Sequence, residues 1–371
     1  MCSPQGLVHD LSATNRNIMS RHITAEFRGQ KERHMRRIFH GTDAAQGHAF
    51  VSLCWPSGID ILHRSSVYWR LPDGASKKES EREIEKGDHM PVVHVNDVDL
   101  HYEIHGEGFP LVLAHGYCTS INLWQHQIPL LSQRYRVIAY DARGHGLSSA
   151  PAGKEHYTLS HLVADMHALL QHLGVEQAYI SGHSMGGATT AGFAARHPEM
   201  TKAALICNID GGHQPSDPEA DRQAAETRRQ AQEMARTRGL TDYARDQIAR
   251  KLVPPFILAS EVEQQFYITR FAHQPLHGYL GVGEALPWRE SWLTEAARLL
   301  KMPVAIIMGT DDVMHRGAEI LHGHLPQSHF VSIEGAPHDS MNARPAAFNK
   351  AYLEYLDNLE QGTPVAGRRT L

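Results

Sequence analysis

The chain has 371 residues, of which 42% are hydrophobic and 21% are charged, and its formal net charge is −5. This length suits one large domain or a domain with a substantial insertion. No apolar run reaches the roughly 18 residues of a membrane span, and no secretory signal is visible after Met1. Residues 1–89 carry a net charge of +2 and residues 90–371 a net charge of −7. The acidic balance of the larger part disfavours a nucleic-acid partner.

Cysteine and histidine usage gives no sign of a metal site. The four cysteines are far apart and form no CxxC pair; they are Cys2, Cys54, Cys118 and Cys207. We therefore expect neither a zinc knuckle nor a disulfide framework, and a reducing, cytoplasmic location. The 27 histidines are scattered and include no HExxH motif, so no metal or cofactor is expected.

The first 89 residues differ from the rest of the chain. They show no sustained period of 2 or 3.6, and they end in a charge run over 77–88 that cannot bury a core. One hypothesis is a disordered extension or small accessory element. Another is that Met90 is the true start of the protein. The intact mass of the protein from its native host distinguishes these hypotheses.

From residue 90 onward, apolar segments alternate between strand-like and helix-like patterns. Strands are predicted over 91–95, 98–104, 110–114, 136–140, 178–182, 203–209, 302–308 and 330–333. Helices are predicted over 123–132, 159–173, 184–196, 316–325 and 343–359. This alternation predicts an α/β fold with a mostly parallel, eight-stranded sheet and helices on both faces. The sheet domain is expected over 90–210 and 301–360, followed by a tail over 361–371.

One long segment interrupts the alternation. Residues 211–300 contain no clear strand, begin with polar sequence and continue with charged, helical sequence. A connection of this length is too long for a loop and predicts a helical cap after the sixth strand. Seven aromatic residues lie in its second half, among them Trp288 and Trp292. They either pack the cap itself or line a substrate pocket beneath it.

The sequence Gly182-His183-Ser184-Met185-Gly186 fits G-x-S-x-G between a predicted strand and a predicted helix. So tight a turn needs small residues two before and two after the serine, which explains both glycines. It places the hydroxyl of Ser184 at a helix N-terminus, where free N–H groups favour developing negative charge. The pattern predicts a nucleophilic serine.

A nucleophilic serine needs oxyanion donors and a base. The backbone N–H of Met185 is the first expected donor. The second is the N–H of Tyr117, because His115-Gly116-Tyr117 follows an earlier strand; His115 itself is expected to brace that loop. The predicted base is His338, in the loop after the last strand of the predicted sheet.

The acid that orients this base should follow the preceding strand. Gly309-Thr310-Asp311-Asp312 offers two neighbouring carboxylates there, and we choose Asp312. Asp311 remains an alternative, as does Asp210, which follows another strand. Tyr117, His183 and Trp288 are expected to bind the substrate.

Residues 90–360 resemble the α/β-hydrolase fold superfamily, in its capped esterase and lactonase-like branch. The resemblance is carried by the motifs that contain Tyr117, Ser184, Asp312 and His338 and by the run Asp141–Ser148. It implies that Asp141–Ser148 is a structural turn. It also implies hydrolysis of an ester or lactone, and the acyl transfer predicted above needs no cofactor. The aromatic-rich cap and Tyr117 indicate a small to medium, partly apolar substrate. The fold alone does not name the substrate.

The motifs disfavour some other branches of the superfamily and leave others open. Its epoxide hydrolases and haloalkane dehalogenases carry an aspartate where this chain has Ser184, and no HGGG stretch follows the third predicted strand. A hydrolase of carbon–carbon bonds in aromatic degradation, or a cofactor-free perhydrolase, shares the same triad and stays open. A ligand-binding protein without catalysis is the alternative from another class. The sequence does not indicate an oligomeric state.

Overall fold

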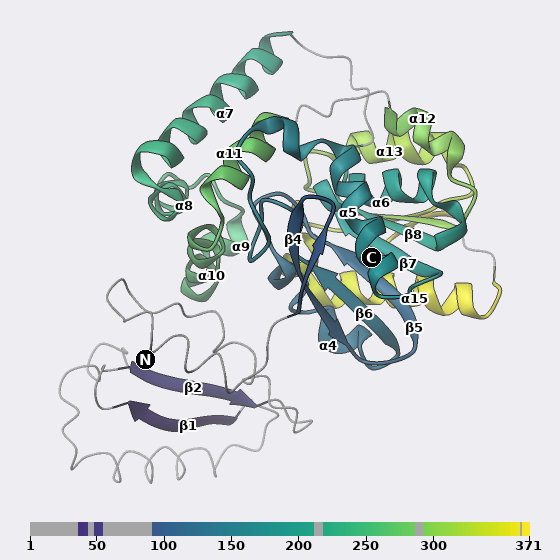
Figure 1. Ribbon diagram of the computed structural model, residues 1–371, viewed down its shortest axis with the longest axis horizontal. Helices are drawn as coiled ribbons and strands as arrows, with labels where there is room; N and C mark the ends of the chain where they lie inside the picture. Colours follow the sequence, from purple (N-terminus) through teal and green to yellow (C-terminus); the bar gives the residue numbers. More distant parts are fainter. Residues whose placement is uncertain (1–35, 44–47, 55–90, 211–217, 286–291, 364–365) are drawn as a thin grey trace. The chain divides into compact units, whose positions relative to one another are not determined.

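The computed structural model describes residues 36–43, 48–54, 91–210, 218–285, 292–363 and 366–371 (Figure 1). The chain divides into two compact units, Met1–Asp88 and His89–Leu371. In the first unit, β1 (Arg36–Asp43) pairs antiparallel with β2 (His48–Cys54). The sequence predicted no regular element there. Strand β1 lacks apolar alternation because it begins with two arginines and contains Gly41, beside a bulge between Phe39 and Thr42.

The second unit is built on a nine-stranded sheet in the order β11-β10-β9-β8-β7-β5-β6-β4-β3. Its strands are β3 (Val92–Val95), β4 (Val98–His105), β5 (Phe109–Ala114), β6 (Tyr135–Tyr140), β7 (Ala178–His183), β8 (Thr201–Cys207), β9 (Val304–Gly309), β10 (His329–Ile333) and β11 (Gly367–Thr370). Strand β4 runs antiparallel to β3 and β6, and every neighbouring pair from β6 to β11 is parallel. The predicted mostly parallel α/β sheet is confirmed.

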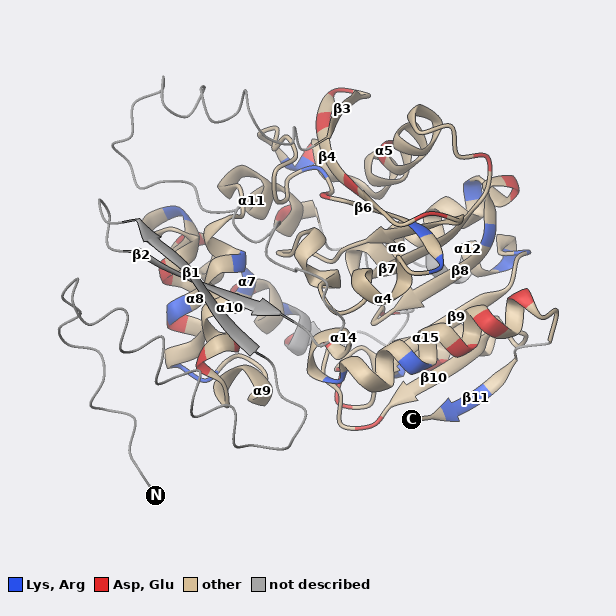
Figure 2. Ribbon diagram, turned by 90° about the horizontal axis from the view of Figure 1, so that it is seen from below, with Lys and Arg blue, Asp and Glu red and all other residues tan. Residues whose placement is uncertain are grey.

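The sheet has one strand more than predicted. Strand β11 comes from the predicted tail and pairs with β10 at the edge of the sheet. Its four residues, Gly-Arg-Arg-Thr, are all exposed, and the sequence carries no apolar signal. Arg368 and Arg369 give this strand its positive charge (Figure 2). Charged side chains on an edge strand discourage pairing with another chain.

Helices cover both faces of the sheet because the central strands are apolar on both sides. In β5, Leu111 and Leu113 pack into one buried cluster, whereas Val112 and Ala114 pack into another. The first cluster includes α15 (Pro345–Glu360), and the second includes α5 (Leu159–His172) and Phe193 of α6 (Met185–Arg196). This two-sided burial is expected for parallel strands.

Six helices lie between β8 and β9 in the described part of the chain: α7 (Pro218–Arg238), α8 (Leu240–Ala249), α9 (Pro255–Leu258), α10 (Glu261–Ala272), α11 (Leu276–Ala285) and α12 (Trp292–Leu299). Helices α7 to α10 gather at one side of the sheet layers (Figure 2). Helix α12 instead packs on α6 and on α13 (His315–His324). We refer to α7–α11 as the cap. A search of the described helices finds none with the length and apolar character needed to cross a membrane.

Candidate active site

The sharp turn at Ser184 joins β7 to α6. Ser184 has φ 52° and ψ −113°, a strained conformation for a residue with a side chain. Its neighbours His183 and Met185 are buried, whereas Ser184 itself is half-buried. The turn therefore holds one hydroxyl out of an otherwise buried segment, at the N-terminus of a twelve-residue helix.

Two glycines make this turn possible. A Cβ atom at Gly182 would lie 2.1 Å from the carbonyl oxygen of Gly186, and one at Gly186 would lie 2.2 Å from that of Ala114. Both distances are far below a van der Waals contact, so each position excludes any larger residue. The backbone of the loop after β5 thus approaches the turn closely.

The same loop carries Gly116 and Tyr117. A Cβ at Gly116 would lie 3.3 Å from the Cβ of Ser184, so this loop borders the serine directly. Within the described part of the chain, the amide N–H groups of Tyr117 and Met185 have no hydrogen-bond acceptor. His115 is buried beneath the loop, where its Nε2 accepts from the amide of Ala142 at 2.9 Å and its Nδ1 donates to the Gly116 carbonyl at 2.8 Å.

The run Asp141–Ser148 forms a hydrogen-bonded turn below this loop. Buried Asp141 accepts from the amides of Ile121 and Leu147 and lies 3.0 Å from the Nδ1 of His101. Each carboxylate oxygen is thus occupied by groups that hold backbone in place. Such an arrangement gives the run a structural role.

His338 and Asp312 lie together at the carboxyl edge of the sheet, in loops that follow β10 and β9. The Nδ1 of His338 lies 2.9 Å from the Oδ2 of Asp312, and the His338 side chain is 35% exposed while that of Asp312 is fully buried. A histidine that donates from Nδ1 keeps Nε2 as a proton acceptor. Gly309 permits the two loops to meet, because a Cβ there would lie 2.0 Å from the carbonyl oxygen of Ala336.

Asp312 also accepts hydrogen bonds from two further donors. The Nδ2 of Asn208 lies 2.9 Å from Oδ2, and the amide of Met314 lies 3.0 Å from Oδ1. Burial alone would raise the pKa of Asp312, but the hydrogen bond and charge of His338, with these donors, bring the pKa down to about 2. The carboxylate is therefore ionised at neutral pH.

Asn208 was not found from the sequence. It follows β8 directly, is fully buried and has a positive φ of 49°. Its Oδ1 accepts from the hydroxyl of Ser340 at 2.6 Å, which leaves its amide group to donate to Asp312. A single asparagine after a strand belongs to no recognisable motif, so the sequence alone does not indicate this role.

His338 is surrounded by further charged and titratable groups. Burial acts to lower its pKa, but the hydrogen bond and charge of Asp312, together with the charge of Asp339, raise the pKa above its ordinary value. The Nε2 of His183 donates to the backbone carbonyl of His338 at 3.0 Å, and the two rings lie 4.7 Å apart. The residue before Ser184 thus ties the turn to the loop of His338.

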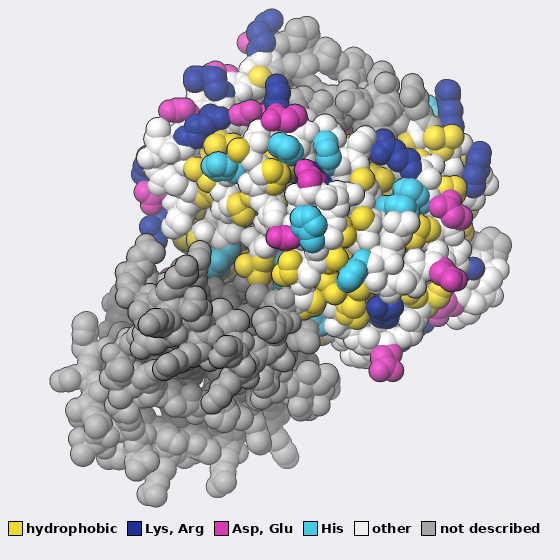
Figure 3. Space-filling model, in the orientation of Figure 1, with side chains coloured by type: hydrophobic (Ala, Val, Ile, Leu, Met, Phe, Trp, Pro, Cys, Tyr) yellow, Lys and Arg dark blue, Asp and Glu magenta, His cyan; other side chains and the backbone are white. Residues whose placement is uncertain are grey.

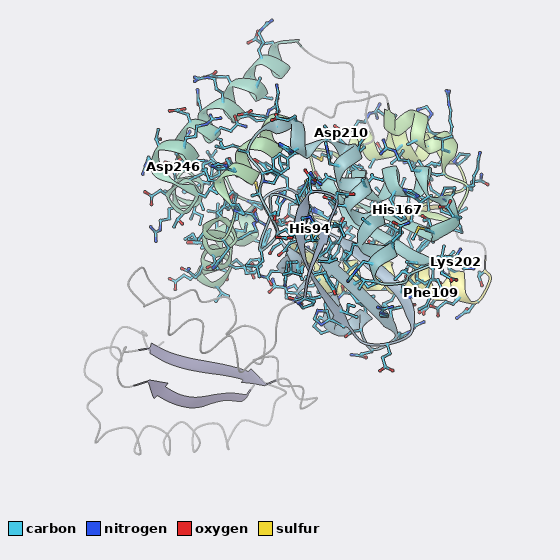
Figure 4. All side chains as sticks on the ribbon, in the orientation of Figure 1. His94, Phe109, His167, Lys202, Asp210 and Asp246 are labelled. Carbon is cyan, nitrogen blue, oxygen red and sulfur yellow. The ribbon has the colours of Figure 1, made fainter. Side chains whose placement is uncertain are left out.

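The other predicted acids lie elsewhere. Asp311 is exposed and forms a turn, in which its amide donates to the Ala336 carbonyl at 3.0 Å. Asp210 is exposed beyond the end of β8 (Figure 4). Asp312 has the hydrogen bond to the Nδ1 of His338.

The three predicted substrate-binding residues have different surroundings. Tyr117 is half-buried, and its hydroxyl donates to the Tyr279 carbonyl of α11 at 2.6 Å while the rings stack 5.6 Å apart. His183 is fully enclosed; burial and the nearby His338 lower its pKa to about 4. Trp288 lies outside the described residues.

Within the described part of the chain, no group of three or more His, Cys, Asp or Glu side chains is arranged to hold a metal ion. Histidine side chains on the visible face are dispersed over it (Figure 3). At the carboxyl edge of the sheet, a serine, a carboxylate and a histidine follow β7, β9 and β10, respectively.

Comparisons with known proteins place the chain in a family. Residues 110–342 match the family described as alpha/beta hydrolase fold. The chain is 32% identical over 272 residues to 3-oxoadipate enol-lactonase 2 of Acinetobacter baylyi, a match that covers 71% of this chain and 97% of that protein.

Solved structures agree with this match. The enol-lactonase from Burkholderia xenovorans LB400 is 29% identical, with a TM-score of 0.62, and covers 72% of this chain and all of its own. A carboxylesterase from Nitrososphaera gargenis is 26% identical, with a TM-score of 0.65, and covers 74% of this chain and all of its own. The chain belongs to the α/β-hydrolase fold family of hydrolases.

Proposed function

We propose that this hydrolase cleaves carboxylic esters or lactones of small to medium, partly apolar substrates by acyl transfer through Ser184, His338 and Asp312. The observation that carries the proposal is a serine at the sharp turn whose preceding residue, His183, contacts His338, a histidine with its Nδ1 hydrogen-bonded to a buried carboxylate. The similarity to an enol-lactonase and to a carboxylesterase supports the same bond class.

The first half of the reaction forms an acyl-enzyme. The Nε2 of His338 takes the proton of Ser184 as its Oγ attacks the acyl carbon. The amides of Met185 and Tyr117 hold the resulting oxyanion. Asp312 stabilises the imidazolium, and collapse of the intermediate returns the proton from His338 to the leaving alkoxide, which departs as the alcohol.

The second half regenerates the enzyme. His338 takes a proton from water, and the hydroxide equivalent attacks the acyl carbon of the ester on Ser184. Collapse then releases the carboxylic acid and returns the proton to Ser184. In a lactone, the alcohol and the acid remain parts of one product.

A substrate panel tests this proposal. It contains short-chain esters, aryl esters, lactones and a dienoate from ring cleavage, assayed with the intact chain and with Ser184→Ala. The matched control is Ser160→Ala, which removes an exposed hydroxyl on α5. We expect turnover of an ester or lactone by the intact chain and the control, and a loss of at least about 10³-fold in Ser184→Ala.

Two results would replace the proposal. Turnover of the dienoate without any ester or lactone would point to carbon–carbon bond hydrolysis. Tight binding of a panel member without turnover, and with no labelling of Ser184 by a fluorophosphonate, would favour a binding protein.

A further inference from the structure

An ion pair links the cap to the loop of the proposed base. Arg270 of α10 places its Nη1 3.1 Å from the Oδ2 of Asp339, the residue that follows His338. Both side chains are only 14% exposed. Exposed ion pairs contribute little to stability. In a largely buried pair, loss of one partner leaves the other charge uncompensated, so the two side chains stay together.

The cap holds Arg270 in place through its own aromatic rings. The guanidinium lies 4.8 Å from the ring centre of Tyr267 and 5.6 Å from that of Phe271. Its Nε is buried and has no hydrogen-bond partner among the described residues. Stacking on two rings limits the rotamers of this arginine, so its charge is anchored to α10.

Two more contacts join the cap to the other side of the site. The Nε2 of Gln274, between α10 and α11, donates to the Thr119 carbonyl at 2.7 Å, and the hydroxyl of Tyr117 donates to the Tyr279 carbonyl. The cap therefore contacts the loop of the proposed oxyanion donors as well as the loop of His338. Helix α10 and the start of α11 bridge the two loops.

The titratable and charged groups that interact with His338 come from several elements. Asp312 lies in the loop after β9, Asp339 is the next residue in the chain, and Arg270 belongs to α10. His183, at the end of β7, is a buried neutral neighbour. Burial would raise the pKa of Asp339, but the charges of Arg270, His183 and His338 lower it. His338 thus interacts with two carboxylates, of which the second is paired with a cation from the cap.

We propose that Arg270 and Asp339 are a positioning pair through which the cap fixes the loop of His338 and balances the charge around its imidazole. The proposal rests on the proposed role of His338 as the base. Neither residue needs to touch the substrate. The cap is then a structural part of the catalytic arrangement as well as a cover over it.

Opposite effects of the two partners follow from this arrangement. Asp339→Asn removes a negative charge beside His338, so the pKa of His338 falls and the acid limb of kcat/KM moves to lower pH. Arg270→Gln leaves Asp339 uncompensated, so the pKa of His338 rises and the limb moves to higher pH. We expect shifts of about half a pH unit or more.

Two control variants separate charge from packing. Arg270→Lys keeps the cation and is expected to leave the limb near its original position. Arg236→Gln breaks an exposed ion pair inside the cap, between Arg236 and Glu284, and is expected to leave the limb unchanged. Limbs that stay fixed in both Asp339→Asn and Arg270→Gln, or that move in the same direction, would overturn the proposal.

An NMR titration of the His338 imidazole gives the same readout without any substrate. Its resonance is assigned as the one missing from His338→Gln, and the Asp339→Asn and Arg270→Gln variants are expected to shift its midpoint in opposite directions. If the intact chain hydrolyses no ester, the proposed function fails while this titration still tests the pair. A midpoint that is the same in all variants would contradict the pair's role.

Discussion

At the scale of single residues, the oxygen Oδ2 of Asp312 organises the proposed triad. It lies 2.9 Å from both the Nδ1 of His338 and the Nδ2 of Asn208. Two donors on one oxygen fix the direction from which the carboxylate meets the imidazole. Ser340 in turn fixes the amide orientation of Asn208. The orientation of His338 therefore depends on two fully buried residues, Asn208 and Ser340.

This dependence predicts the effect of Asn208→Ala. Loss of one hydrogen bond to a charged group corresponds to about 1.5–3 kcal/mol, so we expect kcat to fall about 10- to 100-fold with little change in KM. The pKa of Asp312 should rise as well. Steady-state kinetics check the first point, with the exposed Asn122→Ala as control. Unchanged kcat would show that His338 and Met314 orient the carboxylate without Asn208.

The sequence predicted Ser184, His338 and Asp312 because a motif or a strand-end loop marks each of them. It did not predict Asn208, Ser340, Arg270 or Asp339. Asn208 and Asp312 are 104 positions apart, and nothing local indicates that they meet. In the sequence, Arg270 is one of many charged residues of a helical segment. Its contact with Asp339 becomes visible only in the structure.

At the scale of elements, the turn between β7 and α6 stores strain that its surroundings must support. Ser184 keeps a positive φ because β7 pairs on both sides, with β5 and β8, and because α6 is buried along most of its length. The backbones at the end of β5, the end of β7 and the start of α6 approach one another so closely here that no side chain fits between them. Small residues are therefore a requirement of the geometry.

We predict that Gly186→Ala destabilises the fold strongly, because its Cβ would lie 2.2 Å from the Ala114 carbonyl oxygen. A cost of about 3 kcal/mol or more is expected from overpacking against the backbone. Gly323→Ala in α13 is the matched control, since nothing lies within 4 Å of its new Cβ. Thermal denaturation measures both. Equal melting temperatures for the two variants would contradict the close approach.

The elements that the sequence predicted best are the central strands. They are short apolar runs buried on both faces, a pattern that few other structures produce. The helix predicted over 123–132 is instead a 3-10 turn over Ile121–Trp124 followed by α4 (Ile128–Leu131), with a proline at position 129. Strand β11 escaped prediction because an exposed edge strand needs no apolar residue.

At the scale of the whole molecule, buried neutral histidines couple stability to pH. Burial and the neighbouring His115 lower the pKa of His145 to about 3, and burial and His338 lower that of His183 to about 4. In the unfolded chain both titrate near 6.5. Between these values the unfolded chain binds protons that the folded chain does not, so acid favours unfolding.

We therefore predict that the melting temperature falls as pH is lowered from about 6.5 towards 4, before most carboxylates are protonated. The raised pKa of His338 acts in the opposite direction, since its contribution is present below 6.5 and is lost as pH rises through its folded-state pKa. Because the pKa is lowered in at least two histidines and raised in one, we expect the destabilising effect of acid to prevail. A melting temperature that is constant from pH 7 to pH 4.5 would contradict this account.

We expect the second compact unit to fold and to keep its activity without the first. Among the described residues, four apolar clusters draw on positions between 93 and 371, and Ser184, Asp312 and His338 lie in the same unit. A chain that starts at Met90 is expected to keep its melting temperature and to keep kcat/KM within about twofold. Circular dichroism and ester kinetics check this. Loss of folding in the shortened chain would assign a structural role to residues 1–89.

The most direct test of the proposed function is the intact mass of the protein during turnover of an activated aryl ester, with rapid acid quenching. The account predicts a transient mass increase equal to one acyl group, located on Ser184 by peptide mapping, and none in Ser184→Ala. In His338→Gln the increase should form slowly or not at all, because the proton of Ser184 has no acceptor. Turnover by the intact chain that continues undiminished in Ser184→Ala, or an acyl group found on another residue, would contradict the account.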